Sequence, residues 1–261
     1  MKVELLGHTQ LAISLRDEIL RTHDFLSPDF DEETKEVTYE GATCGQTIAL
    51  AAIRQCYSHK TALEVLETES EKYFGDKGKE GKRLFNHIVK SGHTSTLEHI
   101  HFTFAVEGVS RALLAQLTRH RQLSFSVQSQ RYNKFSSDSR SGGFDYVIPH
   151  SVKDEWVEKK IDGNTYCTTP MASYKEMMKT IQEFYDFLIG LGIPQEDARS
   201  VLPNAATCNL VTSGNLRAWL EFYKKRKKGE GAQHEITVFA ELIRTEITNV
   251  EPWVSEYFDL S

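Results

Sequence analysis

One stretch of this sequence changes its hydrophobic period, and that change constrains the fold more than any other feature. Over 99–107, apolar residues alternate with mostly polar ones, which is typical of a half-buried β-strand. Elsewhere, apolar residues recur at steps of three and four, as they do in amphipathic helices. Many helices and few strands predict an α+β fold, with a small, mostly antiparallel sheet flanked by helices and a helical C-terminal half.

The same periods locate the other elements. Further strands or extended segments are expected over 3–6, 123–128 and 144–148. Helices are expected over 44–57, 79–91, 110–118, 170–190, 215–228 and 232–250, with a short one between Pro194 and Pro203. The methionines, tyrosines and aliphatic residues after Pro170 form a stripe that is typical of a core or a subunit contact. Because no repeat or long flexible linker divides the chain, we predict a single domain over 1–261.

The composition excludes several classes of protein. No apolar run approaches the roughly 20 residues that cross a bilayer, and Glu4 and Asp17 interrupt the region where a signal peptide is apolar. The four cysteines have no paired short spacing, which argues against a disulfide framework and a zinc ribbon. A net charge of −6 disfavours a general nucleic-acid binder. We therefore expect a cytoplasmic protein that binds neither membranes nor nucleic acid.

Charge is unevenly distributed along the chain. The thirty residues 108–137 contain no Asp or Glu but carry five basic side chains, so the rest of the chain carries −11. Carboxylates would repel a bound anion, whereas guanidinium groups bind phosphate through paired hydrogen bonds. The pattern predicts an anion site in this window; the alternative is a surface patch that lacks acids.

Within this window, Arg119, His120 and Arg121 are consecutive, so they cannot share one face of a helix or strand. Such a run suits a turn that surrounds a ligand with several hydrogen-bond acceptors. The hydroxyl of Ser129 and the guanidinium of Arg131 could then hold the phosphate of a nucleotide. The alternative is a solvated basic turn with serines nearby.

A second polar segment covers 92–101. A metal site would use His93, His99 and His101, with Glu98 as a further ligand, but their spacing matches no zinc pattern, so we expect no metal. A loop that offers imidazole, hydroxyl and carboxylate groups equally suits the polar edge of a cofactor. The chain has no Gly-x-Gly-x-x-Gly turn and no Gly-Lys-Ser/Thr loop, which disfavours Rossmann and P-loop nucleotide sites. It has no Gly-x-Ser-x-Gly elbow either.

Several separated segments, taken in order, resemble the flavin-dependent thymidylate synthases, a family unrelated to the cysteine-dependent enzyme. They are SGHTSTLEH at 91–99, RHRQLSFSVQSQRY at 119–132, ARSVLP at 198–203, NLRAWLEFYKKR at 215–226 and AQHEI at 232–236. The second resembles the family's signature. The resemblance implies an FAD-dependent methyltransferase that converts dUMP into dTMP, with 5,10-methylenetetrahydrofolate and NADPH as co-substrates. It also implies a homotetramer whose active sites are shared between chains.

Carried over position by position, the resemblance implies two sets of ligand-binding residues. The flavin set comprises His93, Ser95, Glu98, Arg119, His120, Arg121, Val127, Asn215, Leu216, Arg217 and Glu221. The nucleotide set comprises Gln116, Leu117, Thr118, Arg119, Val127, Gln128, Ser129, Gln130, Arg131, Arg199 and Arg226. Arg226 and Ser129 are the implied catalytic residues.

Arg226 is singled out from the basic run 224–228 by the resemblance and not by its own chemistry. Without a cysteine nucleophile, C5 of the pyrimidine becomes nucleophilic only if negative charge builds in the ring, most simply by loss of the N3 proton. An arginine beside N3 stabilises that anion and stays protonated. Ser129 then positions the substrate, because a nucleophilic serine needs an adjacent base. No side chain transfers a hydride, so the flavin would do so.

Three positions depart from the family's pattern. Val127 stands where Glu or Gln is frequent, Glu221 where Asn or His is usual, and Gly231 in place of a frequent histidine. The alternatives to a thymidylate synthase are a flavin-dependent enzyme that methylates or hydroxymethylates another pyrimidine nucleotide, such as deoxycytidylate, a metalloenzyme that uses the histidines, and a non-catalytic nucleotide- or RNA-binding protein.

Overall fold

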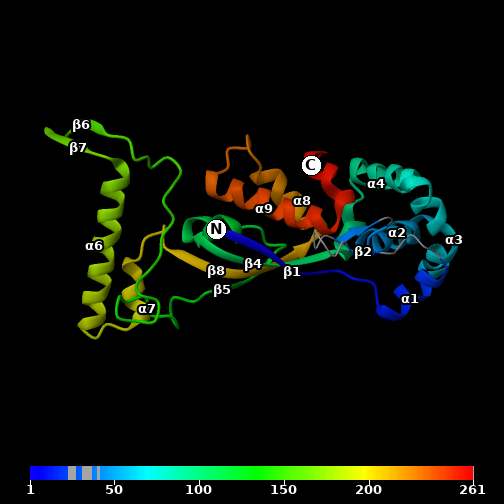
Figure 1. Ribbon diagram of the computed structural model, residues 1–261, viewed down its shortest axis with the longest axis horizontal. Coiled ribbons are helices and arrows are strands. Elements are labelled where there is room, and N and C mark those ends of the chain that lie inside the picture. Colours follow the sequence, from blue (N-terminus) through cyan, green and yellow to red (C-terminus); the bar gives the residue numbers. More distant parts are fainter. Residues whose placement is uncertain (23–27, 31–36, 40–41, 261) are drawn as a thin grey trace. The chain divides into compact units, whose positions relative to one another are not determined.

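The computed structural model describes residues 1–22, 28–30, 37–39 and 42–260 (Figure 1). The chain forms two compact units. Unit 1 consists of 1–4, 105–212 and 231–239, and unit 2 consists of 5–104, 213–230 and 240–261. Each unit combines segments that are far apart in the sequence, so neither corresponds to a simple cut of the chain.

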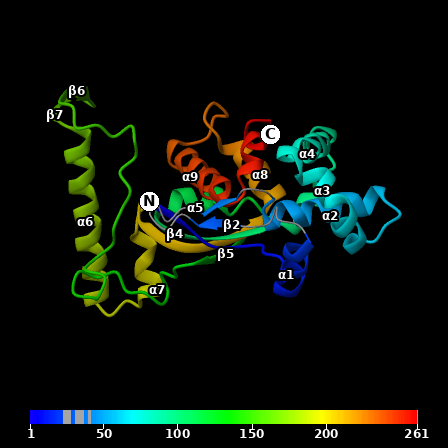
Figure 2. The same cartoon turned by 45° about the vertical axis from the view of Figure 1, so that its right-hand side comes forward.

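A four-stranded sheet has the strand order β1-β4-β8-β5. The strands are β1 Lys2–His8, β4 His101–Ser110, β5 Ser124–Val127 and β8 Thr207–Asn215, and β4 and β8 run side by side in Figures 1 and 2. Along β4, Phe102, Phe104 and Val106 are buried, and the residues between them are more exposed, as the alternation predicts. This small antiparallel sheet, accompanied by many helices, confirms the predicted α+β fold.

Unit 2 is largely helical. Its elements are α1 Ile13–Thr22, α2 Cys44–Tyr57, α3 Ala62–Phe74, η2 Asp76–Gly78, α4 Lys79–Ser91, η3 Thr94–His99, α8 Leu216–Arg226, η5 Pro252–Val254 and α10 Ser255–Leu260, with the antiparallel pair β2 Pro28–Phe30 and β3 Val37–Tyr39. Helix α9, His234–Val250, contributes residues to both units. Two helices begin at a threonine: the side chains of Thr43 and Thr61 accept hydrogen bonds from the backbone N–H three residues on, which satisfies a donor that the helix leaves unpaired.

Trp219 lies at the centre of the core of unit 2. Its indole is fully buried and makes edge-to-face contacts with Phe104 and Phe222, at ring-centroid distances of 5.2 and 5.8 Å. Its Nε1 donates to the carbonyl of Gly214 (3.2 Å), so burial leaves no unpaired donor. The start of α8 is thereby tied to β4.

Unit 1 contains α5 Arg111–Leu117, the hairpin β6 Val157–Ile161 and β7 Asn164–Thr168, α6 Pro170–Gly190, α7 Gln195–Ala198 and η4 Arg199–Val201. Thr169 caps α6 and Pro170 is its first residue, as predicted. The apolar stripe of α6 packs on the core of unit 1, where Met178 and Tyr185 are buried with Phe135. The stripe is therefore a core contact within the chain.

Some predicted elements differ from the structure. The segment 144–148 is not a strand: it makes a single antiparallel bridge, between Tyr146 and Ala206, because the chain turns at 204–205, directly before Ala206. Strand β4 begins at His101, since the residues before it form η3. Strand β8 and the β6–β7 hairpin are absent from the predicted elements. No helix of the described residues combines the length and the apolar character that crossing a bilayer requires.

Candidate functional site

The segment 118–123 joins α5 to β5, and we call it the basic turn. A backbone hydrogen bond from the amide of His120 to the carbonyl of Leu117 (3.0 Å) closes it. Arg119 and Arg121 are exposed on either side of His120, which is half-buried. The predicted turn is confirmed, and it presents two guanidinium groups from positions two residues apart.

The donors of the basic turn fit an anionic ligand. Across the residues that the structure describes, neither Arg119 nor Arg121 has a carboxylate partner. A guanidinium offers five N–H donors and stays charged at any physiological pH. The turn therefore has the chemistry to bind phosphate or pyrophosphate, which is the anionic part of FAD.

Arg131 has an acidic partner, although the window around it contains no acid. Its Nε donates to Glu196 of α7 at 3.0 Å, and both side chains are about half exposed. The Nε of Arg199 donates to the main-chain carbonyl of Glu196 (2.9 Å). Glu196 thus brings together two arginines of the nucleotide set. It lies 65 residues from Arg131 in the sequence, so the composition of the window does not reveal it.

Other members of the nucleotide set make hydrogen bonds within unit 1 or are buried there. Gln128 bonds the main chain of β8 through its own amide (2.8 Å) and its Oε1 (3.2 Å), while Gln130 and Leu117 are buried. The Oγ of Ser129 accepts from the amide two residues on (3.1 Å), which leaves its hydroxyl proton available to a ligand. Gln116, Thr118 and Val127 lie in the last turn of α5, in the basic turn and at the end of β5.

In unit 2, Arg217 is held between two carboxylates. Its Nη1 donates to Glu98 of η3 (2.6 Å) and its Nε to Glu221, one turn further along α8 (3.1 Å). These contacts raise the pKa of the guanidinium above its ordinary value. We call these three residues the arginine clamp; all three belong to the flavin set. The acid at Glu221 is therefore paired with a cation that it shares with Glu98.

The flavin set also lies at the ends of two elements of unit 2. His93 is the N-cap residue of η3, and Ser95 follows within that turn. Asn215 caps α8 by accepting from the amide of Ala218 (2.8 Å). Leu216 is fully buried, and its N–H donates to a carbonyl next to β4 (2.7 Å), so only its main chain can face a ligand.

Tyr57, the last residue of α2, is a neighbour of this site that the sequence did not predict. Its hydroxyl hydrogen bonds to Nδ1 of His93, and the two rings lie 6.1 Å apart. Such a bond selects which ring nitrogen of the histidine carries a proton. No spacing connects these two residues, which are 36 positions apart.

The remaining candidates for catalytic residues are Arg226 and the cysteines. Arg226 ends α8 in unit 2 and is half-buried, whereas the other arginines of the nucleotide set belong to unit 1. Cys208 is buried, and burial raises the pKa of its thiol, which disfavours the reactive thiolate. Among the described residues, no group of three His, Cys, Asp or Glu side chains is placed to hold a metal ion.

Comparison with known proteins identifies the family. Residues 41–253 match the model of the family described as "Thymidylate synthase complementing protein". Over 198 residues, the chain is 36% identical to the flavin-dependent thymidylate synthase of Geobacter sulfurreducens, covering 76% of this chain and 75% of that protein. This chain belongs to the flavin-dependent thymidylate synthase family. It is therefore an FAD-dependent methyltransferase, and the predicted family and enzyme class are confirmed.

Other members of the flavin-dependent thymidylate synthase family match the chain over nearly its whole length. The protein of Mycobacteroides abscessus is 29% identical over 259 residues, 95% of this chain and 92% of its own. Two solved structures share the fold at 21% identity. One is described as a UMP/dUMP methylase PolB from Streptomyces cacaoi (TM-score 0.66, 99% of this chain and 94% of that one), and the other as ThyX from Helicobacter pylori complexed with FAD and dUMP (TM-score 0.61, 99% and 98%).

Proposed function

We propose that this flavin-dependent thymidylate synthase converts dUMP into dTMP by reductive methylation, with 5,10-methylenetetrahydrofolate as the carbon donor and NADPH as the reductant. The observation that carries the proposal is the basic turn, where Arg119 and Arg121 have no acidic partner in the described residues. Ser129 and Arg131 follow it closely in the sequence. The relative from Helicobacter pylori, described as complexed with FAD and dUMP, supports the same pair of ligands here.

For the substrate, we assign the phosphate of dUMP to Arg131 and Arg199. The Nε of Arg131 is bonded to Glu196, which leaves the two terminal amino groups of the guanidinium to form a fork around the phosphate. Ser129 donates its hydroxyl proton to the same nucleotide. The buried members of the nucleotide set, such as Gln130, support the segment from within unit 1.

For the cofactor, the flavin set would hold FAD. When bound, FAD supplies hydride transfer, which no side chain can provide. Arg119 and Arg121 bind its anionic part, and the arginine clamp provides a wall held together by its two ion pairs. Tyr57 orients the imidazole of His93 through the hydrogen bond described above.

For the reaction, Arg226 stabilises the pyrimidine after the loss of its N3 proton. A fixed guanidinium favours the anionic ring over the neutral one, and it stays protonated throughout. The negative charge at C5 then arises without a cysteine. The buried, protonated thiol of Cys208 supports a mechanism of this kind.

We propose that the whole chain acts as one catalytic domain in a cytoplasmic homotetramer. Beside the core stripe, α6 also carries exposed apolar side chains. Met177, Phe184 and Phe187 of α6, and Leu191 directly after it, are 49 to 63% exposed. Exposed apolar surface of this kind is typical of subunit contacts. The mass of the purified protein, measured by light scattering after gel filtration, tests the assembly.

The test of the reaction is dUMP-dependent NADPH oxidation, with the product identified by mass. We expect Arg226→Ala to lower kcat by about 10² to 10³, the usual loss when one stabilising donor is removed. Lys225→Ala is the matched control, because its side chain is exposed on the same helical turn. NADPH oxidation that depends on UMP and not on dUMP, or that Arg226→Ala leaves unchanged, would contradict the proposal.

A further inference from the structure

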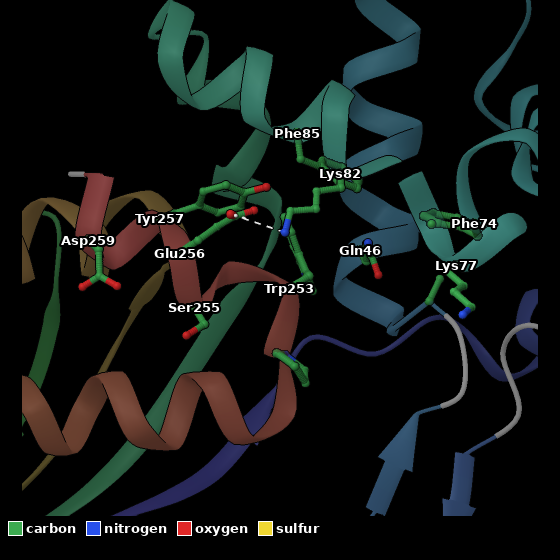
Figure 3. A pocket seen from close by; sticks show the side chains of 13 residues that line it. Gln46, Phe74, Lys77, Lys82, Phe85, Trp253, Ser255, Glu256, Tyr257 and Asp259 are labelled. Atoms are coloured by element: carbon green, nitrogen blue, oxygen red, sulfur yellow. Dashed lines mark ion pairs between the residues drawn. The ribbon is translucent and has the colours of Figure 1, made fainter. Parts of the chain in front are cut away.

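Unit 2 contains a cavity of about 570 Å³ that shares no residue with the flavin or nucleotide sets. It lies among α2, α3, α4 and the C-terminal segment formed by η5 and α10 (Figure 3). Ligand-binding pockets in proteins usually measure about 300 to 1,000 Å³. The cavity is therefore large enough for a small organic molecule.

Aromatic rings form one wall of this cavity. The rings of Phe85 and Trp253 lie 4.7 Å apart, and Tyr257 stands edge-on to Trp253 at 5.8 Å. The indole is held in place because its Nε1 donates to the buried carboxyl group of Glu251 (2.6 Å). Phe85 and Tyr257 are buried behind the indole, and only Trp253 is partly exposed, so its ring is the surface on which a planar ring can stack.

The ionic balance of the cavity leaves one cation. Lys82 pairs with Glu256 at 3.6 Å, and Figure 3 shows its ammonium group directed at that carboxylate. Asp259 pairs with Arg244 outside the lining (2.8 Å). Of the charged lining residues, only Lys77 has no ion pair within the described part of the chain. An anion entering the cavity would meet an uncompensated ammonium group.

The backbone next to Lys77 adds to this positive end. Lys77 and Gly78 both have left-handed conformations, with φ of 59° and 67°. They lead directly into α4, whose first turn has no side-chain cap. The unpaired N–H groups and the dipole of a helix favour an anion at such a start. A lysine in a left-handed conformation is also uncommon, and residues of this kind cluster at functional sites.

Gln46 supplies the remaining polar group. It lies in the first turn of α2, is half-buried and lines the cavity. Its carboxamide makes no hydrogen bond to any residue that the structure describes. A carboxamide places a donor and an acceptor side by side in one plane, and this pair matches the edge of a nucleobase.

We propose that this cavity is a second nucleotide site that takes a nucleoside monophosphate. The base stacks on the partly exposed indole of Trp253, and its edge hydrogen bonds to Gln46. The phosphate lies at the start of α4 beside Lys77, because that ammonium group is the uncompensated charge. The proposal does not depend on the reaction assigned above, since the two sites have no residue in common.

The test is calorimetric titration of AMP, GMP and CMP into the FAD-loaded enzyme saturated with dUMP, so that the catalytic nucleotide and flavin sites are filled. We expect at least one of the three to bind with a Kd below about 1 mM. Adenosine, ribose 5-phosphate and inorganic phosphate should each bind at least about 10-fold more weakly, because each lacks one of the recognised parts. The flavin absorbance after titration shows whether FAD has stayed bound.

Variants locate the binding. Lys77→Glu should weaken it about 10-fold or more, and Gln46→Ala about 3-fold, at unchanged melting temperature. Lys90→Glu is the matched control, since this exposed lysine lies at the other end of α4 and does not line the cavity. The proposal is overturned if none of the three nucleotides binds at about 5 mM, if phosphate alone binds as well as they do, or if Lys90→Glu weakens binding as much as Lys77→Glu. Loss of dTMP formation with binding intact would contradict only the proposed reaction.

Discussion

Two groups of arginines from the flavin set differ in their acidic partners. In the basic turn of unit 1, Arg119 and Arg121 are exposed, and no carboxylate in the described residues pairs with them. In the arginine clamp of unit 2, Arg217 has Glu98 at 2.6 Å and Glu221 at 3.1 Å. The same residue type therefore stands in two different electrostatic settings.

The difference separates two roles. An unpaired guanidinium keeps its charge and its donors for an anionic ligand. A guanidinium between two carboxylates has committed two of its N–H groups to them, and their negative charge outweighs its own, so it mainly holds its neighbours in position. We infer that the basic turn contributes ligand charge and that the clamp contributes shape.

The largest effect should come from the basic turn. Arg119→Ala removes a cation from both ligand sets, and we expect kcat/KM for dUMP to fall about 100-fold or more. Arg140→Ala is the control, an exposed arginine in unit 1 outside both sets. Steady-state kinetics of the two variants decide the matter. Equal activities would show that the unpaired Arg119 of the basic turn contributes nothing to binding.

The carboxyl group of Glu251 has no arginine partner among the described residues, unlike the carboxylates of the arginine clamp. Glu251 is fully buried and accepts from Thr43, from the amide of Gly45 and from Trp253. Burial raises its pKa from 4.5 to about 7, because the hydrogen bonds only partly offset the loss of water. His8 lies 3.9 Å from this carboxyl group, and its own pKa is lowered by burial.

The raised pKa of Glu251 predicts a pH-dependent stability. The folded state holds the proton more tightly than the unfolded state, so the stabilisation is complete below about pH 4.5 and is lost as the pH rises through about 7. Between pH 5 and 8, the unfolding free energy should fall by roughly 2 kcal/mol more in the natural protein than in Glu251→Gln. The glutamine of the variant cannot ionise, and His8 is present in both proteins, so the difference reports on Glu251 alone. Urea titrations at both pH values measure this. Parallel pH profiles would show that Glu251 does not titrate in this range.

Within the arginine clamp, the two carboxylates should differ. Glu98 comes from another segment and makes the shorter contact, so we expect Glu98→Gln to weaken FAD binding about 10-fold. Glu221 is one helical turn from Arg217, and such pairs contribute only about 0.5 kcal/mol, so Glu221→Gln should change the Kd less than about 3-fold. Flavin fluorescence during titration measures both. A larger effect of Glu221→Gln would assign the clamping role to the helical pair instead.

The smallest effect is expected at Glu196. Its pair with Arg131 is about half exposed, and pairs of this kind contribute at most about 1 kcal/mol. Glu196→Gln should therefore lower the unfolding free energy by less than about 1 kcal/mol and raise the KM for dUMP about 2-fold, since Arg131 loses its orientation but keeps its charge. Denaturant titration and kinetics check both values. A KM change as large as that of Arg119→Ala would place Glu196 among the groups on which binding depends.

Much of the local structure could be predicted because its causes are local. The helices 44–57 and 79–91 have the predicted bounds, since apolar spacing and the residues at their ends act over one or two turns. Strand β8 could not be found in this way. It carries alternating burial, but its sequence mixes Thr, Asn, Ser and Gly with few large apolar residues, and it depends on pairing with distant strands.

The sequence by itself determined the family, the run of arginines in the basic turn and the caps that start the helices, because each is a matter of residue type at short spacing. Only the tertiary structure decided which charges are balanced. Glu196 reaches Arg131, Glu98 reaches Arg217 and Tyr57 reaches His93 across 65, 119 and 36 positions. Electrostatic and hydrogen-bond energies depend on distance in space, and the chain brings these pairs within hydrogen-bond reach only after its helices and strands have packed.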